Sequence, residues 1–248
     1  MKAVSLVIRL NSLYSIRIPY TWQSALTYPI PPPSAIIGML ANALQRYQKD
    51  DSPLKYLDKM EDEIIWAGAR LLSATVIKSY TTSAITNWKI KMGGKSTNAL
   101  GRQYGFTRNI EILAVLKDDN FKDELENALL TSPITCGDSE SIATVEEIKT
   151  DLKCKEVVVD SEEEIETLYP FPYDFNKIKL VGNDSGLIYM IHERCRKEGK
   201  SFPLTSYLFP IKKEGRVFSP SKVYIRNRVP IKIIEIEDKG KIIKQILN

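Results

Sequence analysis

Residues 18–44 read IPYTWQSALTYPIPPPSAIIGMLANAL, and this stretch decides how the first half of the chain is organised. Its prolines, Pro29 and Pro31–Pro33, hold the end of a loop extended, because each proline fixes φ and restricts the residue before it. Ser34 follows as the expected N-cap of a helix. Apolar residues then recur at helical spacing: Ile36, Met39, Leu40, Ala43, Leu44 and Tyr47. The pattern predicts a loop over 11–33 that leads into a helix ending near Lys49.

The elements on either side of this stretch follow a recognisable order. Strands are predicted at 3–10, 64–80, 105–117 and near 142–149, with helices starting at Ser52-Pro53 and spanning about 120–131. The order β-α-β-β-α-β is that of ferredoxin-like folds, which carry both helices on one face of a four-stranded sheet. We therefore expect an α+β fold whose ferredoxin-like (RRM-like) domain covers residues 1–150.

The second half of the chain, residues 151–248, is expected to be rich in β-structure. Candidate strands lie at 155–159, 186–192, 204–211, 222–226 and 230–236. Their order in a sheet does not follow from the sequence.

The charge of the chain is distributed unevenly. The net charge is +4, but residues 1–110 carry 14 Lys/Arg against 6 Asp/Glu. Between Ile64 and Ile110 there are seven bases and no acid, with aromatic residues among them. A second basic stretch, Arg194–Arg228, has ten bases against two acids. Such clustering is typical of a surface that binds a polyanion, although an uneven solvated surface has the same composition.

Residues 81–104 interrupt the regular pattern with glycines and small polar residues, which indicates an exposed excursion, such as a β-hairpin. At its end, RQYGFTR (102–108) partly matches the aromatic segment by which RNA-recognition domains stack bases. A core strand with two aromatic residues would account for the same residues.

Several classes of chemistry are disfavoured. GGKST (93–97) lacks the first glycine of a phosphate-binding loop, since Lys89 stands there. The single histidine, His192, fits a non-catalytic strand position better than a general base. Three scattered cysteines give no zinc site and fit a reducing cytoplasm. No apolar run is long enough to cross a membrane. We expect no cofactor and no metal.

The proline-rich stretch resembles a known family. An R-(I)-P…YP-(I/L)-PPP-(S/T)-A-I-x-G-(M/L)-L-A-N pattern is similar to that of the CRISPR-associated family-five subunit of type I interference complexes. It is carried here by Arg17, Pro19, Tyr28, Pro29, Pro31–Pro33, Ser34, Ala35, Ile36, Gly38, Leu40 and Asn42. CGDSES (136–141) is similar to the turn after the second helix of that family. Archaeal members, of the type I-A kind, are the most similar.

The resemblance implies a partner and a site. It implies a ferredoxin-like domain with an inserted hairpin "thumb", here about 78–108, that grips the 5′ handle of the CRISPR RNA. It also implies contacts with family-seven backbone subunits and a large subunit of the complex (Cascade), with target DNA as a further candidate partner. The expected RNA-binding residues are Arg17, Tyr20, Trp22, Ser34, Lys78, Trp88, Lys89, Lys91, Lys95, Arg102, Tyr104 and Arg108.

Two other functions stay open at the level of sequence. One branch of the family cuts precursor RNA with a tyrosine, a lysine and a histidine, so a metal-independent endoribonuclease is the first alternative. Here His192 lies far from the N-terminal region, which disfavours cleavage and leaves no expected catalytic residue. The second alternative is a general single-strand RNA-binding protein unrelated to CRISPR.

Overall fold

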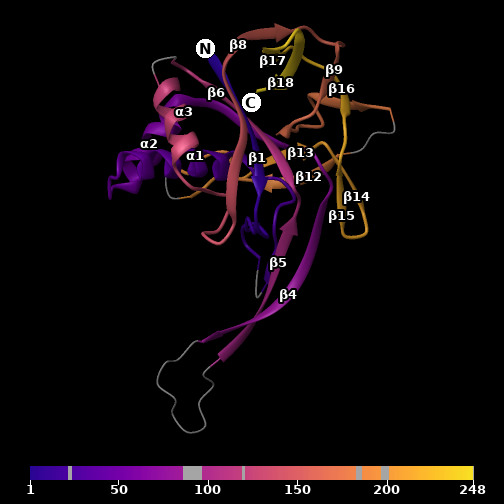
Figure 1. The fold of residues 1–248 in the computed structure, drawn as a ribbon. Helices are drawn as coiled ribbons and strands as arrows, with labels where there is room; N and C mark the ends of the chain where they lie inside the picture. Colours follow the sequence, from indigo (N-terminus) through magenta and orange to yellow (C-terminus); the bar gives the residue numbers. More distant parts are fainter. Residues whose placement is uncertain (22–23, 86–96, 119–120, 183–185, 197–200, 248) are drawn as a thin grey trace.

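The main sheet contains strands from both ends of the sequence. The computed structural model describes residues 1–21, 24–85, 97–118, 121–182, 186–196 and 201–247 (Figure 1). Seven strands form one antiparallel sheet: β1 (Lys2–Leu10), β3 (Ile64–Leu71), β6 (Asn109–Leu116), β7 (Ile134–Thr135), β8 (Ile142–Val159), β17 (Ile231–Asp238) and β18 (Lys241–Ile246). The order is β18-β17-β8-β1-β6-β3, with β7 paired to the start of β8. Strands from both ends of the sequence therefore share one sheet.

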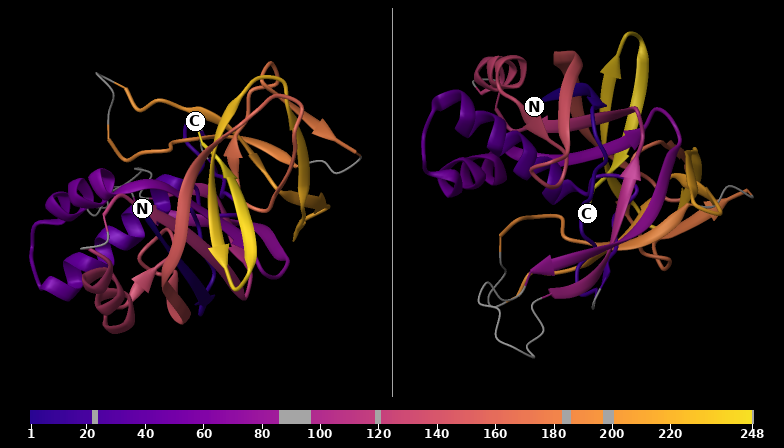
Figure 2. Two further views of the ribbon diagram at one scale, coloured as in Figure 1. Left: turned by 90° about the horizontal axis from the view of Figure 1, so that it is seen from above. Right: turned by 60° about the horizontal axis from the view of Figure 1, so that its bottom comes forward.

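Three helices cover one face of this sheet. They are α1 (Pro33–Gln48), α2 (Pro53–Glu63) and α3 (Lys122–Thr131), and they gather on the same side of the molecule (Figure 2). Alternate residues of β1, such as Leu6 and Ile8, are buried against Ile36 and Leu40 of α1, as expected for a strand with period two meeting an amphipathic helix. The opposite face packs Trp66 against Tyr169. The strands β1, β3 and β6 are thus buried on both sides, whereas β8 is largely exposed on one side.

A second sheet contains the hairpin. Its order is β14-β15-β4-β5-β2, formed by β2 (Ser24–Ala25), β4 (Thr75–Ile85), β5 (Thr97–Phe106), β14 (Ile211–Glu214) and β15 (Val217–Pro220). β4 and β5 form a long antiparallel ribbon that projects from the body of the molecule (Figure 1). The excursion predicted from the sequence is therefore a β-hairpin, with β14 and β15 at its base.

Two small sheets complete the second half. One has the order β10-β13-β12, from β10 (Phe171–Pro172), β12 (Leu187–Ile191) and β13 (Thr205–Phe209). The other has the order β11-β16-β9, from β9 (Glu164–Thr167), β11 (Ile178–Val181) and β16 (Val223–Asn227). Residue 150, the boundary expected from the sequence, lies inside β8. None of the helices in the described part of the chain is long and apolar enough to span a membrane.

Several predicted boundaries are wrong, and the bend between the two sheets explains most of them. The strand predicted over 64–80 is two strands, and the strand predicted over 105–117 begins at Asn109. The ribbon passes from one sheet to the other at residues 72–74 and 107–108, where Ser73 and Thr107 bond side chain to side chain at 2.9 Å. The predicted strands near 142–149 and at 155–159 are a single strand, β8.

The predicted cap of α1 is also wrong. The helix begins at Pro33 with Pro32 as N-cap, and Ser34 lies in its first turn. Proline is well suited to the first helical position, because its φ is already helical and its missing N–H would be unpaired there anyway. The N–H groups of Ala35 and Ile36 both bond the carbonyl of Pro32. Because Pro33 has no N–H and Ala35 and Ile36 use theirs, few backbone donors remain at this helix start for an anion.

Candidate nucleic-acid interface

The loop before α1 lies along β5 at the base of the hairpin. Tyr14 and Gly105 exchange backbone hydrogen bonds of 3.0 and 2.8 Å, and β2 continues the contact in parallel with β5. The Tyr14 ring is buried, and its hydroxyl donates to the carbonyl of Pro29 at 2.7 Å. Burial raises the pKa of Tyr14 above its ordinary value, so the hydroxyl keeps its proton. This packing fixes Arg17 next to the hairpin base.

The CGDSES turn (136–141) packs against the loop before α1. Gly137 has a φ of 99°, and a Cβ there would lie 2.6 Å from the carbonyl oxygen of Ser15, so only glycine fits. The hydroxyl of Ser141 contacts the carbonyl of Leu13 at 3.0 Å and the carboxylate of Asp138. The turn is thus held against the loop before α1.

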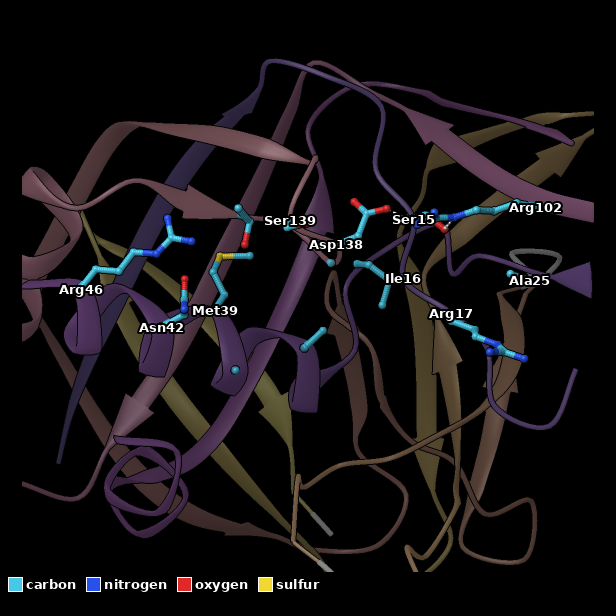
Figure 3. Close-up of a pocket in the computed structure, with 14 residues that line it drawn as sticks. Ser15, Ile16, Arg17, Ala25, Met39, Asn42, Arg46, Arg102, Asp138 and Ser139 are labelled. Atoms are coloured by element: carbon cyan, nitrogen blue, oxygen red, sulfur yellow. Dashed lines mark hydrogen bonds and ion pairs between the residues drawn. The ribbon is translucent and has the colours of Figure 1, made fainter. Parts of the chain in front are cut away.

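The loop before α1, the hairpin base, the CGDSES turn and one face of α1 line an open cavity of about 810 Å³ (Figure 3). It is lined by Ser15, Ile16, Arg17, Ala25, Ala35, Gly38, Met39, Asn42, Arg46, Arg102, Thr135, Gly137, Asp138 and Ser139. Figure 3 shows Arg46 at one end of the cavity, Arg17 and Arg102 at the other, and Asp138 with Ser139 between them. A space of this size is within the range of small-ligand sites.

The cavity is positively charged. Among the described residues that line it, three are arginines and one, Asp138, is an acid. Arg102 donates to Asp138, and its Nε lies 3.4 Å from the Ser15 hydroxyl. Arg46 and Arg17 donate to the carbonyls of Pro133 (3.0 Å) and Thr21 (3.2 Å). Neutral carbonyls orient a guanidinium without cancelling its charge, so the cavity suits an anionic ligand.

The sequence comparisons assign the family. A family model described as CRISPR-associated protein (Cas_Cas5) matches residues 5–207. The chain belongs to this Cas5 family. The match confirms the resemblance that residues 18–44 carry, and it supports a role for this Cas5 protein in CRISPR–Cas interference. The comparison with curated protein sequences finds no match.

One solved structure shares the fold of this Cas5 protein. The crystal structure of a CRISPR protein from Archaeoglobus fulgidus is similar over 100% of both chains, with a TM-score of 0.59 and 14% identity. A chain in the cryo-EM structure of the Type III-B Cmr-beta complex bound to cognate target RNA and AMPPnP is 14% identical, with a TM-score of 0.46 over 88% of this chain and 86% of that one. At such identity the first likeness shows a shared fold.

The structure brings part of the predicted site of this Cas5 protein together. Arg17 and Arg102 line the cavity, and Arg102 also lies over the ring of Tyr104, with its guanidinium carbon 4.8 Å from the centroid. Lys78 is exposed and pairs in register with Tyr104. Tyr20 and Arg108 are exposed outside the cavity lining. Trp22, Trp88, Lys89, Lys91 and Lys95 lie outside the described residues.

Ser34 also lies outside the cavity lining, and several residues of the lining were not among those predicted. The carbonyl of Ser34 accepts a hydrogen bond from the Cys195 thiol at 3.3 Å. Gly38, Asn42 and Arg46 were not predicted, although they recur every four residues in α1 and so share one helix face. This spacing could have been recognised in the sequence. Asp138 belongs to the CGDSES turn, but its pairing with Arg102 depends on the fold.

His192 lies apart from this site. Its Nδ1 is 2.8 Å from the carbonyl oxygen of Pro203, which requires the ring proton on Nδ1, and its ring packs edge-on against Phe202. It follows the end of β12 and is not among the residues that line the cavity. Within the described residues, no group of three or more His, Cys, Asp or Glu is placed to hold a metal ion.

Proposed function

We propose that this chain is a non-catalytic RNA-binding subunit of a type I CRISPR interference complex (Cascade). In this proposal the cavity between α1, the CGDSES turn and the hairpin base holds the 5′ handle of the CRISPR RNA. The observation that carries it is the group of three arginines, Arg17, Arg46 and Arg102, around one cavity in a Cas5-family chain. Guanidinium groups pair readily with phosphate oxygens.

The architecture fits a ferredoxin-like interpretation. The strands β8-β1-β6-β3 have the 4-1-3-2 order of the β-α-β-β-α-β motif, and α1 and α3 share a hydrophobic core with β1. We propose that residues 1–150 form this RNA-binding domain, that the β4–β5 ribbon is its thumb, and that residues 151–248 form a β-rich region sharing β8 with it.

The proposed partners follow from the assembly. A subunit that holds one end of the guide RNA must meet the subunits that cover the rest of it, so we propose contacts with family-seven backbone subunits and with the large subunit. The subtype is proposed to be the archaeal type I-A kind. Target DNA is a further candidate partner.

The non-catalytic assignment rests on the position of His192. An imidazole can act as a general base only within hydrogen-bond reach of the proton it removes. The Nδ1 of His192 is engaged by the carbonyl of Pro203, and neither residue lines the proposed RNA cavity. The alternative is a metal-independent endoribonuclease that matures precursor RNA. Incubation of the purified chain with labelled repeat RNA in EDTA separates the two, because only the enzyme gives a defined product.

The binding test uses two arginines of the cavity. We expect R17A/R46A to bind labelled repeat RNA at least about tenfold more weakly than the parent, with a smaller dependence on salt, since each lost phosphate contact reduces counterion release. K177A/K179A, which removes two exposed lysines of the second half, is the matched control. Equal affinities of the parent and R17A/R46A would contradict the proposal.

A further inference from the structure

The acid in the cavity faces one of its arginines. Among the described residues that line the cavity, Asp138 is the only acid, and it accepts a hydrogen bond from Arg102. Their side chains are 22% and 32% exposed, so an anion that enters the cavity can reach the pair. Arg17 and Arg46 differ, because they donate to neutral backbone carbonyls. In the free chain, Arg102 is thus already occupied by an anion that belongs to the chain itself.

The tight turn at 138–141 holds this carboxylate in place. The N–H of Ser141 donates to the carbonyl of Asp138 at 3.2 Å, and the Ser141 hydroxyl contacts the carboxylate. Arg102 is held as well, with its guanidinium carbon 4.8 Å from the centroid of the Tyr104 ring. A partner fixed on the same chain has a high effective concentration, because no translational freedom is lost when the contact forms. A free anion therefore competes poorly with Asp138 for Arg102.

The carboxylate affects a lone phosphate group and a nucleic-acid strand differently. Any phosphate that binds Arg102 must displace Asp138, which leaves an unpaired carboxylate beside a second negative charge, and close like charges are unfavourable. This penalty is the same for both ligands. Only a strand has further phosphates for Arg17 and for Arg46, which lies at the opposite end of the cavity (Figure 3). Binding at several sites at once offsets a penalty that a single phosphate group cannot overcome.

We propose that Asp138 is a specificity-determining residue, which keeps inorganic phosphate and mononucleotides out of the cavity and reserves it for a strand with several phosphates. In the free chain its carboxylate pairs with Arg102, and in the bound chain a phosphate of the strand takes its place. The inference rests on the proposed RNA-binding function, and it explains why a cavity for an anion contains an acid.

The first test measures thermal unfolding of the full chain in inorganic phosphate, at an ionic strength held constant with chloride. A ligand that binds only the folded chain raises its melting temperature. We expect about 20 mM phosphate to raise the melting temperature of D138N by about 2 °C or more and to leave that of the parent almost unchanged. D160N, the matched control, removes the same charge from an exposed position in the second half and should behave as the parent does.

The second test measures binding of labelled repeat RNA in the presence of phosphate. D138N should bind the RNA about two- to fivefold more tightly than the parent, since the ion pair no longer has to be broken and a partly exposed pair contributes little more than this. Phosphate should displace the RNA from D138N at a concentration about fivefold lower than from the parent. D160N should match the parent in both measurements.

The outcomes separate this inference from the proposed function. Equal phosphate responses of D138N and the parent would overturn the role of Asp138, and so would weaker RNA binding by folded D138N, which would make Asp138 a residue that positions Arg102. If D138N does not fold, D138S is measured in the same way, since serine also suits the first position of a tight turn. A parent chain that binds no RNA would overturn the proposed function, whereas the phosphate response of D138N still decides whether Asp138 excludes small anions.

Discussion

Tyr14 and Gly105 set the geometry at the base of the hairpin. A Cβ on Gly105 would lie 2.4 Å from the ring carbon Cζ of Tyr14, far inside contact distance. The ring cannot easily retreat, because it is buried and its hydroxyl is bonded to the carbonyl of Pro29. A single missing side chain therefore lets the loop before α1 lie against β5, and the arginine cavity depends on that contact.

We predict that G105A lowers the free energy of unfolding by about 1–3 kcal/mol, the usual cost of overpacking a filled site. Urea denaturation measures it. The control is G38A, since a Cβ on Gly38 meets no atom within 4 Å. Because alanine forms helix better than glycine, G38A should gain about 0.5–1 kcal/mol. A G105A chain as stable as the parent would show that the Tyr14 ring can move.

At the scale of elements, the hairpin shows what the sequence could predict. The acid-free stretch with glycines and small polar residues indicated an exposed excursion, and β4 and β5 confirm it. The bend at residues 72–74 could not be predicted, because Ser73 and Thr107 meet only after the two long strands have paired. Residues 102–108 fitted both a base-stacking segment and a core strand, and the structure leaves Phe106 exposed.

The tip of the hairpin carries the next prediction. K89A/K91A/K95A removes three lysines that lie outside the described residues, in a stretch without acids. We predict that the melting temperature hardly changes, since surface substitutions usually lie within about 0.5 kcal/mol. Binding to repeat RNA, or assembly with guide RNA and partner subunits, should weaken about tenfold or more, because phosphate contacts are lost.

The control for this triple variant changes the net charge equally. K177A/K179A/K241A removes three exposed lysines from the second half of the chain. A general effect of net charge would weaken both variants alike. If only the control weakens, or if neither does, the hairpin is not the thumb, and the basic stretch 194–228 becomes the better candidate for the main RNA surface.

Helix α1 was easier to predict from the sequence than strand β8. The apolar period of α1 predicted its C-terminal end to within a residue, since local spacing alone decides it. Its start was missed by two positions, because Ser34 was expected as the N-cap and Pro32 takes that place, with Pro33 as the first helical residue. The strand β8 was split in two, because its many charged residues face solvent and hide the pairing with β1 and β17.

At the scale of the whole molecule, the two halves of the sequence are not separate in space. β17 and β18 extend the sheet that β1 begins, and β15 pairs with β4 of the hairpin. Sequence patterns report neighbours along the chain, so such long-range pairings could not be predicted from them. The junction also explains why the cavity needs the second half: the hairpin base is held between the loop before α1 and β15.

Arg194 connects the second half of the chain to the end of α2 and the start of β3. Its guanidinium donates to the carbonyls of Ile64 (2.8 Å) and Ile65 (3.0 Å), at the start of β3. It also lies 3.7 Å from the carboxylate of Glu61, whose side chain is 3% exposed and which accepts the N–H of Cys195. Removing the guanidinium would leave a buried carboxylate without this partner, and that is more costly than losing a surface pair.

We predict that R194A lowers the free energy of unfolding by about 2–3 kcal/mol, less than for a fully buried pair because Arg194 is partly exposed. For a chain of this size the melting temperature should fall by about 5–10 °C. R196A is the matched control two residues away: its partners Asp58 and Asp62 are exposed, so its loss should cost at most about 1 kcal/mol. Equal melting temperatures for R194A and R196A would mean that the sheets alone hold the two halves together, and that Glu61 finds water or another donor when Arg194 is gone.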